Sequence, residues 1–429
     1  MIKVLYLVAG DLSFDEMLFL DTFINQMPQA FARHHILAPT LPLSHVTLQS
    51  RNTGVTLARP GYSDEDFRQL LKEFDPQIVI LVDPSTLLVP DAPDLTYVDM
   101  TWFDAIPCVL AVMDFRANLL KTRDDQLALA PYIEAGETPP FTLDYDFLIK
   151  ICPPHDALPT QNPKLLQWGC QDQMSSLAVL SVRDTVREQL GCTTDTRLVT
   201  MVFPVENTLL AMQKGINAHF QVVVETLIHY LNQLEGQYLL AVVNMPPPFE
   251  DYDFDNVLIR FYPTLDLELL GNLLKATELF LTESLSYPGL IFSALRDIPG
   301  ISIGSSVALQ PDGSLTQRAD ALSPFLQLKL DALKENTPEA IFPFISFPSR
   351  LRHPWPKTEL FRERYLYHLV DLFDEQHLIG LMHELLHNGP AYERFREAVA
   401  EYRLRKLGQA QDAEQIIRKL VTAPPRHLL

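Results

Sequence analysis

The sequence predicts an α/β protein built of two Rossmann-like domains in tandem. At 429 residues the chain is too long for one ordinary core, which favours two domains. Short apolar runs typical of buried strands alternate with helical patterns, and the alternation starts again after the Gly-Cys-Thr-Thr-Asp segment at 191–195. We therefore expect an N-terminal domain over residues 1–190 and a second domain over residues 195–356.

The first domain opens with a strand, a loop and a helix. Ile2–Val8 is a continuous β-branched and leucine-rich run, as expected of a central parallel strand. Apolar residues recur at helical spacing over 14–27, and Ser13 with Glu16 predicts a capping box in front of them. The later elements are a strand at 34–38, a helix at 64–74 and strands at 78–82, 108–113 and 147–152. No element is assigned to residues 161–169.

The second domain repeats this pattern. We expect strands over 198–203, 238–243 and 257–261, and helices over 218–234 and 265–275. The stretch 278–304 follows, with a short apolar run ending at Thr282, a polar break at Glu283-Ser284, a short helix over 290–295 and a strand over 301–303. Parallel strands need crossovers of this kind, and ligands bind where such loops leave the carboxyl ends of the strands.

The stretch 278–304 resembles the donor half-site of the GT-B glycosyltransferases. Ser293-Ala294-Leu295 lies where that superfamily has a Glu-Ala-Leu-like helix start, and 298–301 matches the Pro-containing turn before the next strand. The ribose-binding Glu of the superfamily falls on Ser293, and the glycine pair of the loop is reduced to Gly289. Two Rossmann-like domains in tandem are also the GT-B plan, so the resemblance implies a ligand cleft between the domains.

The end of the chain resembles the end of GT-B chains, which often carry a helix that leaves the second domain and packs on the first. Leu385-Leu386 lies at the Leu-Leu pair of that ending, Arg396 at its arginine and Ala400 near its small residue. The resemblance implies that residues 357–429 are helices that return to the N-terminal domain. Apolar residues at helical spacing support this expectation: Leu366, Leu369, Leu372 and Phe373.

The resemblance implies transfer of a sugar from a nucleotide-sugar to an acceptor. No metal and no separate cofactor are required, because helix dipoles and backbone amides can hold a diphosphate leaving group. A base on the first domain would take the acceptor proton, and the candidates are Asp11 and Asp15. Asp11 is the better candidate, because capping the following helix does not need it. The acceptor-side candidates are Ser13, Asp83 and Asp114, although each also suits a cap or a turn.

The expected donor site lies on two loops of the second domain. One follows the strand at 198–203 and the other follows the strand ending at Thr282. Backbone amides there, together with a helix N-terminus, would hold the diphosphate. The donor-binding candidates are Phe203, Pro204, Glu283, Ser284, Tyr287, Pro288, Gly289 and Ser293.

Two alternatives stay open. The missing Glu at Ser293 and the low glycine content of both loops favour a GT-B-like binding or scaffold protein without catalysis. Residues 383–387, His-Glu-Leu-Leu-His, have the HExxH spacing of zinc hydrolases. The Asn-Gly-Pro at 388–390 ends that helix at once, and a surface helix with buried leucines accounts for the same residues, so zinc is the less favoured alternative.

The amino-acid composition limits the classes of partner that the protein is expected to bind. The chain has 34 basic and 54 acidic residues, a formal net charge of −20, which argues against nucleic acid and anionic membranes. No apolar run approaches the ~20 residues of a membrane helix. The four cysteines have no CxxC spacing and fit reduced thiols. We expect a cytoplasmic protein without integral membrane association, and the sequence leaves its oligomeric state open.

Overall fold

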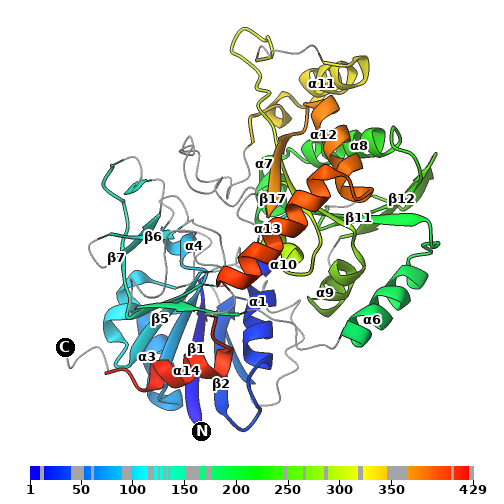
Figure 1. Ribbon diagram of the computed structural model, residues 1–429. Helices are drawn as coiled ribbons and strands as arrows, with labels where there is room; N and C mark the ends of the chain where they lie inside the picture. Colours follow the sequence, from blue (N-terminus) through cyan, green and yellow to red (C-terminus); the bar gives the residue numbers. More distant parts are fainter. Residues whose placement is uncertain are drawn as a thin grey trace. The chain divides into compact units, whose positions relative to one another are not determined.

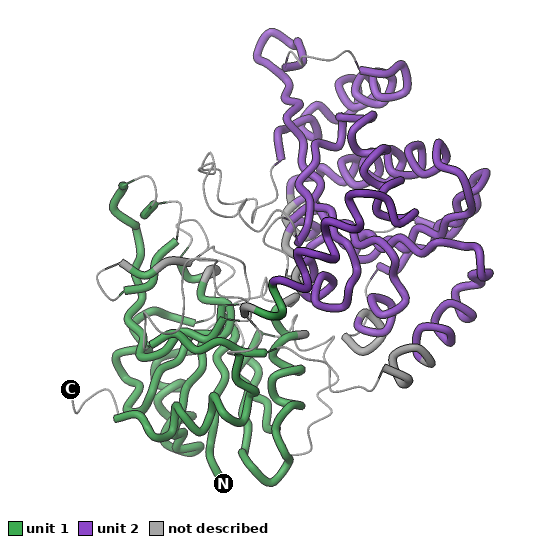
Figure 2. Tube along the Cα trace, in the orientation of Figure 1, with its two compact units in different colours: residues 1–173, 352–362, 402–429 green, residues 174–351, 363–401 purple. Residues whose placement is uncertain are grey.

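The chain divides into two compact units (Figure 2). Unit 1 comprises residues 1–173, 352–362 and 402–429, and unit 2 comprises residues 174–351 and 363–401. The computed structural model describes residues 1–9, 14–39, 53–58, 62–88, 98–114, 120–123, 126–129, 132–133, 136–150, 164–169, 176–245, 249–263, 267–284, 288–316, 322–344, 366–406 and 410–424. The findings below concern these residues.

Unit 1 is built on a parallel sheet of seven strands in the order β10-β9-β5-β4-β1-β2-β3 (Figure 1). The strand order reverses between β1 and β4, which makes the carboxyl ends of these two strands a topological switch point. The strands are β1 (Ile2–Val8), β2 (Ala32–Pro39), β3 (Thr53–Ala58), β4 (Ile78–Val82), β5 (Val109–Asp114), β9 (Phe147–Lys150) and β10 (Leu165–Gln167). The described helices are α1 (Phe14–Asn25), α3 (Asp64–Phe74), α4 (Ser85–Leu88), η2 (Met100–Ala105) and α14 (Ala413–Val421).

The apolar runs of the sequence form the middle of this sheet. Every residue of β4 and β5 is buried, and so is β1 from Val4 onward. Helix α3 begins at a capping box, in which the Ser63 side chain accepts from the Asp66 N–H and the Asp66 side chain accepts from the Ser63 N–H. It ends at Asp75, which has a left-handed backbone with φ 49°.

The connection from β5 to β9 carries strands of its own. It contains a three-stranded antiparallel sheet of β6 (Leu120–Arg123), β7 (Gln126–Leu129) and β8 (Leu143–Asp144). Parallel strands are usually joined through a helix that covers the sheet. This insertion therefore adds a small second layer of its own to unit 1, and β7 packs beside α4 (Figure 1).

Acid should destabilise unit 1 through His34. This side chain is 3% exposed, its Nδ1 lies 3.1 Å from the Tyr6 hydroxyl, and burial lowers its pKa to about 4. The folded state then binds fewer protons than the unfolded state between pH 6.5 and 4. The stability that depends on neutral His34 is therefore fully present above about pH 6.5 and is lost as the pH falls. The loss is roughly 3 kcal/mol. Urea titrations from pH 7 to pH 4 should show a shallower pH dependence for His34→Asn than for the wild type, and equal slopes would contradict the assignment.

Unit 2 has a second sheet of the same design, in the order β13-β14-β12-β11-β15-β16-β17. All neighbouring strands run parallel except β13, which pairs antiparallel with β14 at the edge. The strands are β11 (Thr196–Val202), β12 (Gln237–Val243), β13 (Tyr252–Phe254), β14 (Val257–Tyr262), β15 (Leu279–Thr282), β16 (Gly300–Gly304) and β17 (Tyr367–Asp371). The helices are α6 (Ser176–Gln189), α7 (Val205–Lys214), α8 (Ala218–Leu231), α9 (Leu267–Ala276), α10 (Pro288–Ala294), α11 (Pro324–Asn336), η3 (Pro338–Ala340), α12 (Glu375–Leu386) and α13 (Pro390–Lys406).

The predicted fold class, two Rossmann-like units in tandem, is confirmed. The stretch 278–304 forms β15, α10 and β16, as its apolar runs and breakers predict. The structure divides the chain at 173/174, whereas the sequence suggested a linker at 191–195. The difference is α6, whose Arg183 and Arg187 contact Glu278 of unit 2 at 3.1 and 3.4 Å.

Two local predictions were wrong. Residues 366–373, expected to be helical, contain β17, because this segment pairs in register with β16, which buries Tyr367 and Val370. Residues 203–207, expected to be a loop, contain the start of α7 from Val205 onward. For residues 366–373, a short apolar segment fits either structure, and the pairing with β16 decides.

The C-terminal helix α14 belongs to unit 1, where it packs against β5 (Figure 1). Its apolar face is fully buried, and the Asp412 capping box fixes its start. The Arg418 guanidinium lies 4.7 Å from the centre of the Phe31 ring. Strand β17, helix α12 and most of α13 belong to unit 2, so of residues 357–429 only 357–362 and 402–429 are assigned to unit 1.

Candidate functional site

The strongest candidate site lies at the switch point of the unit 2 sheet, between the carboxyl ends of β11 and β15. These two strands are neighbours in the sheet, but their chain continuations go to opposite sides. Phe203 and Pro204 follow β11, and Glu283 and Ser284 follow β15. All four are buried. Ligands of open α/β sheets bind in the crevice at such a point.

Glu283 connects three elements at this edge. Its side chain is 3% exposed, and the Nε2 atom of His219, in the first turn of α8, lies 2.7 Å from Glu283 Oε2. The Asn207 side-chain amide, in the first turn of α7, donates to Glu283 Oε1 at 3.0 Å. A buried carboxylate requires such partners, and a charge-assisted contact is stronger than one between neutral groups. Glu283 therefore fixes the starts of α7 and α8 relative to the end of β15.

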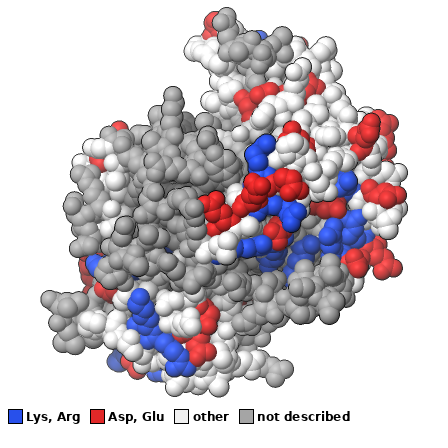
Figure 3. All heavy atoms as spheres, viewed as in Figure 1, with Lys and Arg blue, Asp and Glu red and all other residues white. Residues whose placement is uncertain are grey.

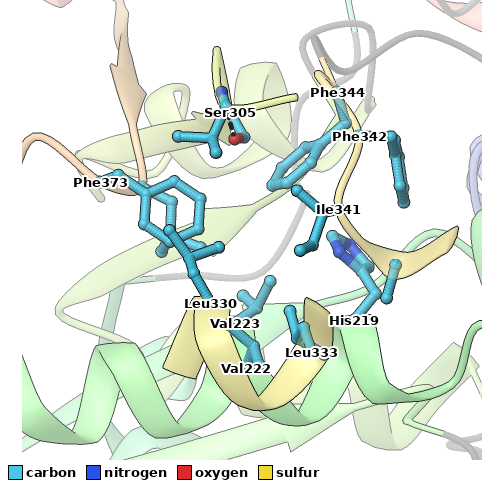
Figure 4. A pocket seen from close by; sticks show the side chains of 13 residues that line it. His219, Val222, Val223, Ser305, Leu330, Leu333, Ile341, Phe342, Phe344 and Phe373 are labelled. Atoms are coloured by element: carbon cyan, nitrogen blue, oxygen red, sulfur yellow. Dashed lines mark hydrogen bonds between the residues drawn. The ribbon is translucent and has the colours of Figure 1, made fainter. Parts of the chain in front are cut away.

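His219 is enclosed by aromatic rings. The centres of the Phe342 and Phe344 rings lie 5.2 and 4.7 Å from the imidazole centre, and Figure 4 shows both rings above His219. The apolar cavity beside them, lined also by Leu330 and Phe373, has a volume of ≈ 20 Å³. That volume holds about one water molecule, so this cavity is a packing void and not a ligand site. His219 contacts this edge from within the core, through Glu283.

The residue that precedes α7 does not cap its first turn. Its N-cap is Pro204, which makes no side-chain capping bond to the first turn. The helix is held in place by Thr208, whose hydroxyl donates to the Asn244 carbonyl at 2.9 Å. Asn244, at the end of β12, has a φ of 63° and donates from its side chain to the Phe203 carbonyl at 3.0 Å. A fixed helix N-terminus without a capping side chain can bind an anion.

The other predicted donor residues have different environments. Gly289 is buried in the first turn of α10, and Ser293 is 0% exposed in the same helix, with no hydrogen-bond partner for its Oγ. α10 begins at Pro288, whereas Tyr287 lies outside the described residues. The structure thus brings Phe203, Pro204, Glu283 and Ser284 together at one edge and shows Ser293 inside the packing of α10.

The predicted residues of unit 1 end neighbouring strands of its sheet. Asp83 follows β4, is 2% exposed and has a φ of 56°. Asp114 is the last residue of β5, and its carboxylate lies 3.1 Å from the Lys150 ammonium at the end of β9. Asp15 lies in the first turn of α1. Asp11 and Ser13 lie outside the described residues.

Sequence reasoning placed Asn207 in the loop after β11 but gave its side chain no role, and it did not identify His219, Asn244 and Lys150 as members of these two edges. Asn244 follows an apolar strand directly, and Lys150 ends one, which is a usable signal for an edge position. His219 and Glu283 are 64 residues apart in the chain, so no local pattern connects them.

The residues of the HExxH stretch make other contacts. Glu384 accepts from the Ala391 N–H at 2.9 Å, and the Tyr238 hydroxyl lies 3.0 Å from His387 Nε2. The His383 and His387 rings stack, with centres 4.8 Å apart. Within the described ranges, no group of three or more His, Cys, Asp and Glu side chains is arranged to hold a metal ion. Leu385 and Leu386 are buried, as predicted for a surface helix with an apolar face.

The surface and helices give two further observations. On the face in Figure 3, acidic and basic side chains of the described residues lie next to one another, so the negative net charge is not gathered in one region of this face. In the part of the chain that the structure describes, no helix has the length and apolar character needed to cross a bilayer.

Comparison with solved structures identifies the fold. Spinosyn forosaminyltransferase SpnP has a TM-score of 0.56 and 11% identity, and the match covers 98% of this chain and 100% of that chain. The glycosyltransferase SnogD from Streptomyces nogalater has a TM-score of 0.51 and 10% identity over 99% and 100% of the two chains. Spinosyn rhamnosyltransferase SpnG, complexed with spinosyn aglycone, has a TM-score of 0.50 and 11% identity over 97% and 99%. The two-unit GT-B fold is therefore shown for almost the whole chain.

Comparison by sequence gives the family. A search of curated proteins finds no significant match. Residues 24–424, nearly the full length, match the model of a family described as "Family of unknown function (DUF6365)". The chain therefore belongs to this family of unknown function (DUF6365), and within it has the GT-B fold.

Proposed function

We propose that the protein transfers a sugar from a nucleotide-sugar to an acceptor, with the donor diphosphate bound at the start of α7. The observation that carries the proposal lies at the switch point of unit 2, where Glu283 holds Asn207 in the first turn of α7 and the N-cap residue, Pro204, makes no capping bond. Its N–H groups would stabilise the negative charge that develops on the leaving diphosphate. This arrangement requires no metal. The fold shared with a forosaminyltransferase and a rhamnosyltransferase supports the reaction class.

Unit 1 would supply the acceptor side and the base. Asp11, which comes three residues after the end of β1 in the sequence, is the proposed base, with Asp15 next. Asp11→Asn should leave nucleotide-sugar binding within about twofold and remove most of the turnover, because it subtracts a proton acceptor and little volume. Release of nucleoside diphosphate from a nucleotide-sugar is the measurement. Full turnover in the variant would move the role to Asp15.

The second candidate is a binding protein with this fold and no catalysis. It is favoured by Ser293, because the residue at the position of the ribose-binding Glu is a serine buried in α10 and offers no carboxylate. The two functions separate in one experiment. Binding of a nucleotide-sugar with no release of nucleoside diphosphate over hours would support the binding protein, whereas multiple turnovers would support the transferase.

Glu283→Gln should weaken binding of a nucleoside diphosphate about tenfold. The substitution keeps the volume of the side chain but loses one of its two acceptor contacts, so Asn207 or His219 is left without a partner and the first turn of α7 is less fixed. One hydrogen bond contributes roughly 1–1.5 kcal/mol, which corresponds to about a factor of ten. Isothermal titration with UDP, dTDP and GDP measures the change, and Asn207→Ala should give a similar loss.

Glu278→Gln is the matched control. Glu278 lies at the opposite end of β15, where it accepts from the Leu198 N–H at 2.9 Å and pairs with Arg183 and Arg187. Its substitution should lower stability without changing the affinity for the nucleotide. Equal losses of affinity in the two Glu→Gln variants would mean that the effect is one of general stability. If none of the three nucleotides binds the wild type, the donor site itself is refuted.

A further inference from the structure

A cavity that described residues of unit 1 line lies beside the crossover between β5 and β9. Its volume is ≈ 350 Å³, and it is formed by η2, β7, β8 and the residues just before β8. Small-molecule sites typically have volumes of about 300–1,000 Å³. The cavity next to His219 in unit 2, by contrast, has a volume of ≈ 20 Å³, which is room for about one water molecule. Unit 1 therefore has room for a ligand beside this crossover.

The cavity has an apolar floor and a polar rim. Phe103 and Leu143 are 4% and 2% exposed, and Met100 adjoins them. The rim consists of Asp104, Gln126, Thr142 and Asp144. The Gln126 side-chain amide donates to Asp144 Oδ1 at 2.9 Å, which orients both groups on neighbouring strands. The two halves of the site thus differ in chemistry: the floor can contact C–H groups, and the rim can donate and accept hydrogen bonds.

We propose that this cavity binds a small polyhydroxyl molecule, a sugar or a polyol. The hydroxyl groups of such a molecule both donate and accept hydrogen bonds. The rim offers two carboxylates, which accept, and the Thr142 hydroxyl and the Gln126 amide, each of which can donate and accept. An apolar sugar face would lie on Phe103 and Leu143. A phosphorylated ligand is disfavoured, because Asp104 and Asp144 would meet it with like charge. Binding of this molecule does not depend on the proposed function. Its identification as the acceptor of the sugar does rest on that function.

The experiment measures binding directly, without any nucleotide. Saturation-transfer NMR with D-glucose and myo-inositol, each at millimolar concentration, should give signals on the ring protons of at least one probe with the full-length protein. Asp104→Ala/Asp144→Ala should reduce the affinity at least tenfold, since two charge-assisted contacts are lost. Both side chains are exposed, so the variant should fold. Glucose 6-phosphate should give a weaker signal than glucose.

Glu137→Gln is the matched control, because Glu137 is an exposed carboxylate of the same crossover and does not line the cavity. It should leave the signals unchanged. No signal from either probe, equal signals in the double variant, or a stronger signal from glucose 6-phosphate would each overturn the proposal. Because the nucleotide titrations probe unit 2 and the sugar titrations probe unit 1, failure of one proposal is distinguishable from failure of the other.

Discussion

Replacing Lys150 with methionine should lower the free energy of unfolding of unit 1 by about 3–5 kcal/mol. The Lys150 ammonium lies 3.1 Å from Asp114 Oδ2, and the two side chains are only 4% and 2% exposed. The substitution removes this cation from the buried Asp114 carboxylate, and weaker compensation of a buried charge is costly. Urea denaturation followed by tryptophan fluorescence measures the loss, because the three tryptophans, at 102, 168 and 355, all belong to unit 1.

An exposed pair of the same kind in the same unit provides the control. Lys3 lies 3.4 Å from Asp75, with side chains that are 34% and 86% exposed. Surface pairs contribute about 0–1 kcal/mol, so Lys3→Met should have a small effect. The double variant Lys150→Met/Asp114→Leu should recover much of the lost stability, because it removes both buried charges together. An effect of Lys150→Met no larger than that of Lys3→Met would contradict the buried pair.

The contact between Lys150 and Asp114 also concerns the prediction that Asp114 lies on the acceptor side. Asp114 was predicted from its place directly after an apolar strand, and the structure confirms that it ends β5. The partner was not predictable, because Lys150 ends a strand 36 residues later and becomes a neighbour only when β5 and β9 pair. A role for Asp114 toward an acceptor stays a prediction, and the Lys150 contact gives its carboxylate a structural function as well.

The fold was predictable where apolar runs are bounded by strong breakers. In the stretch 278–304, Glu283-Ser284 interrupts the first run and Pro299 precedes the second, so β15, α10 and β16 follow from local chemistry. The same signals were absent around β17. Leu366, Leu369 and Leu372 satisfy helical spacing, yet the segment joins the edge of the sheet because β16 offers an unpaired neighbour there. Tertiary pairing overrides the local pattern in such segments.

The candidate site was predictable in position and only partly in composition. Residues after β11 and β15 were expected at the donor site, because the carboxyl ends of adjacent parallel strands meet at one edge. The partner of Glu283 was missed, since His219 lies at the start of a helix that the sequence marks as amphipathic and buried. A histidine in such a helix is normally a core residue. Only the distance of 2.7 Å to Glu283 assigns it to the site.

Ending the chain after Lys406, before the final helix, should make unit 1 insoluble or unstable. Ala413, Ile416, Ile417 and Leu420 of α14 are all 0% exposed, so their removal uncovers an apolar face of the unit 1 sheet. Full burial of three Ile or Leu side chains contributes roughly 5–9 kcal/mol. That is comparable with the whole stability of a typical domain, about 5–15 kcal/mol. Solubility and thermal unfolding of the fragment 1–406 measure the effect.

Loss of polar contacts adds to the loss of stability that the truncation causes. Gln26 Oε1 accepts from Trp168 Nε1 at 2.7 Å and from the Ala413 N–H at 3.4 Å. The Gln411 N–H donates to the Gln167 carbonyl, and the Gln411 carbonyl accepts from the Gly169 N–H, both at 2.9 Å. Without residues 410–424, Gln26, Gln167 and Gly169 lose these hydrogen-bond partners. The truncation should therefore also change the fluorescence of Trp168, which contacts Gln26.

Two further samples separate loss of packing from loss of chain length. Ile416→Val/Ile417→Val keeps the helix and removes two methylene groups, so it should cost about 1–3 kcal/mol in total and leave the protein soluble. A synthetic peptide of residues 407–424 added to the fragment should restore part of its stability, because α14 carries its own capping box at Asp412 and a complete apolar face. If the fragment 1–406 is soluble and unfolds at the wild-type temperature, α14 is an independent appendage and its buried face is not part of the core of unit 1.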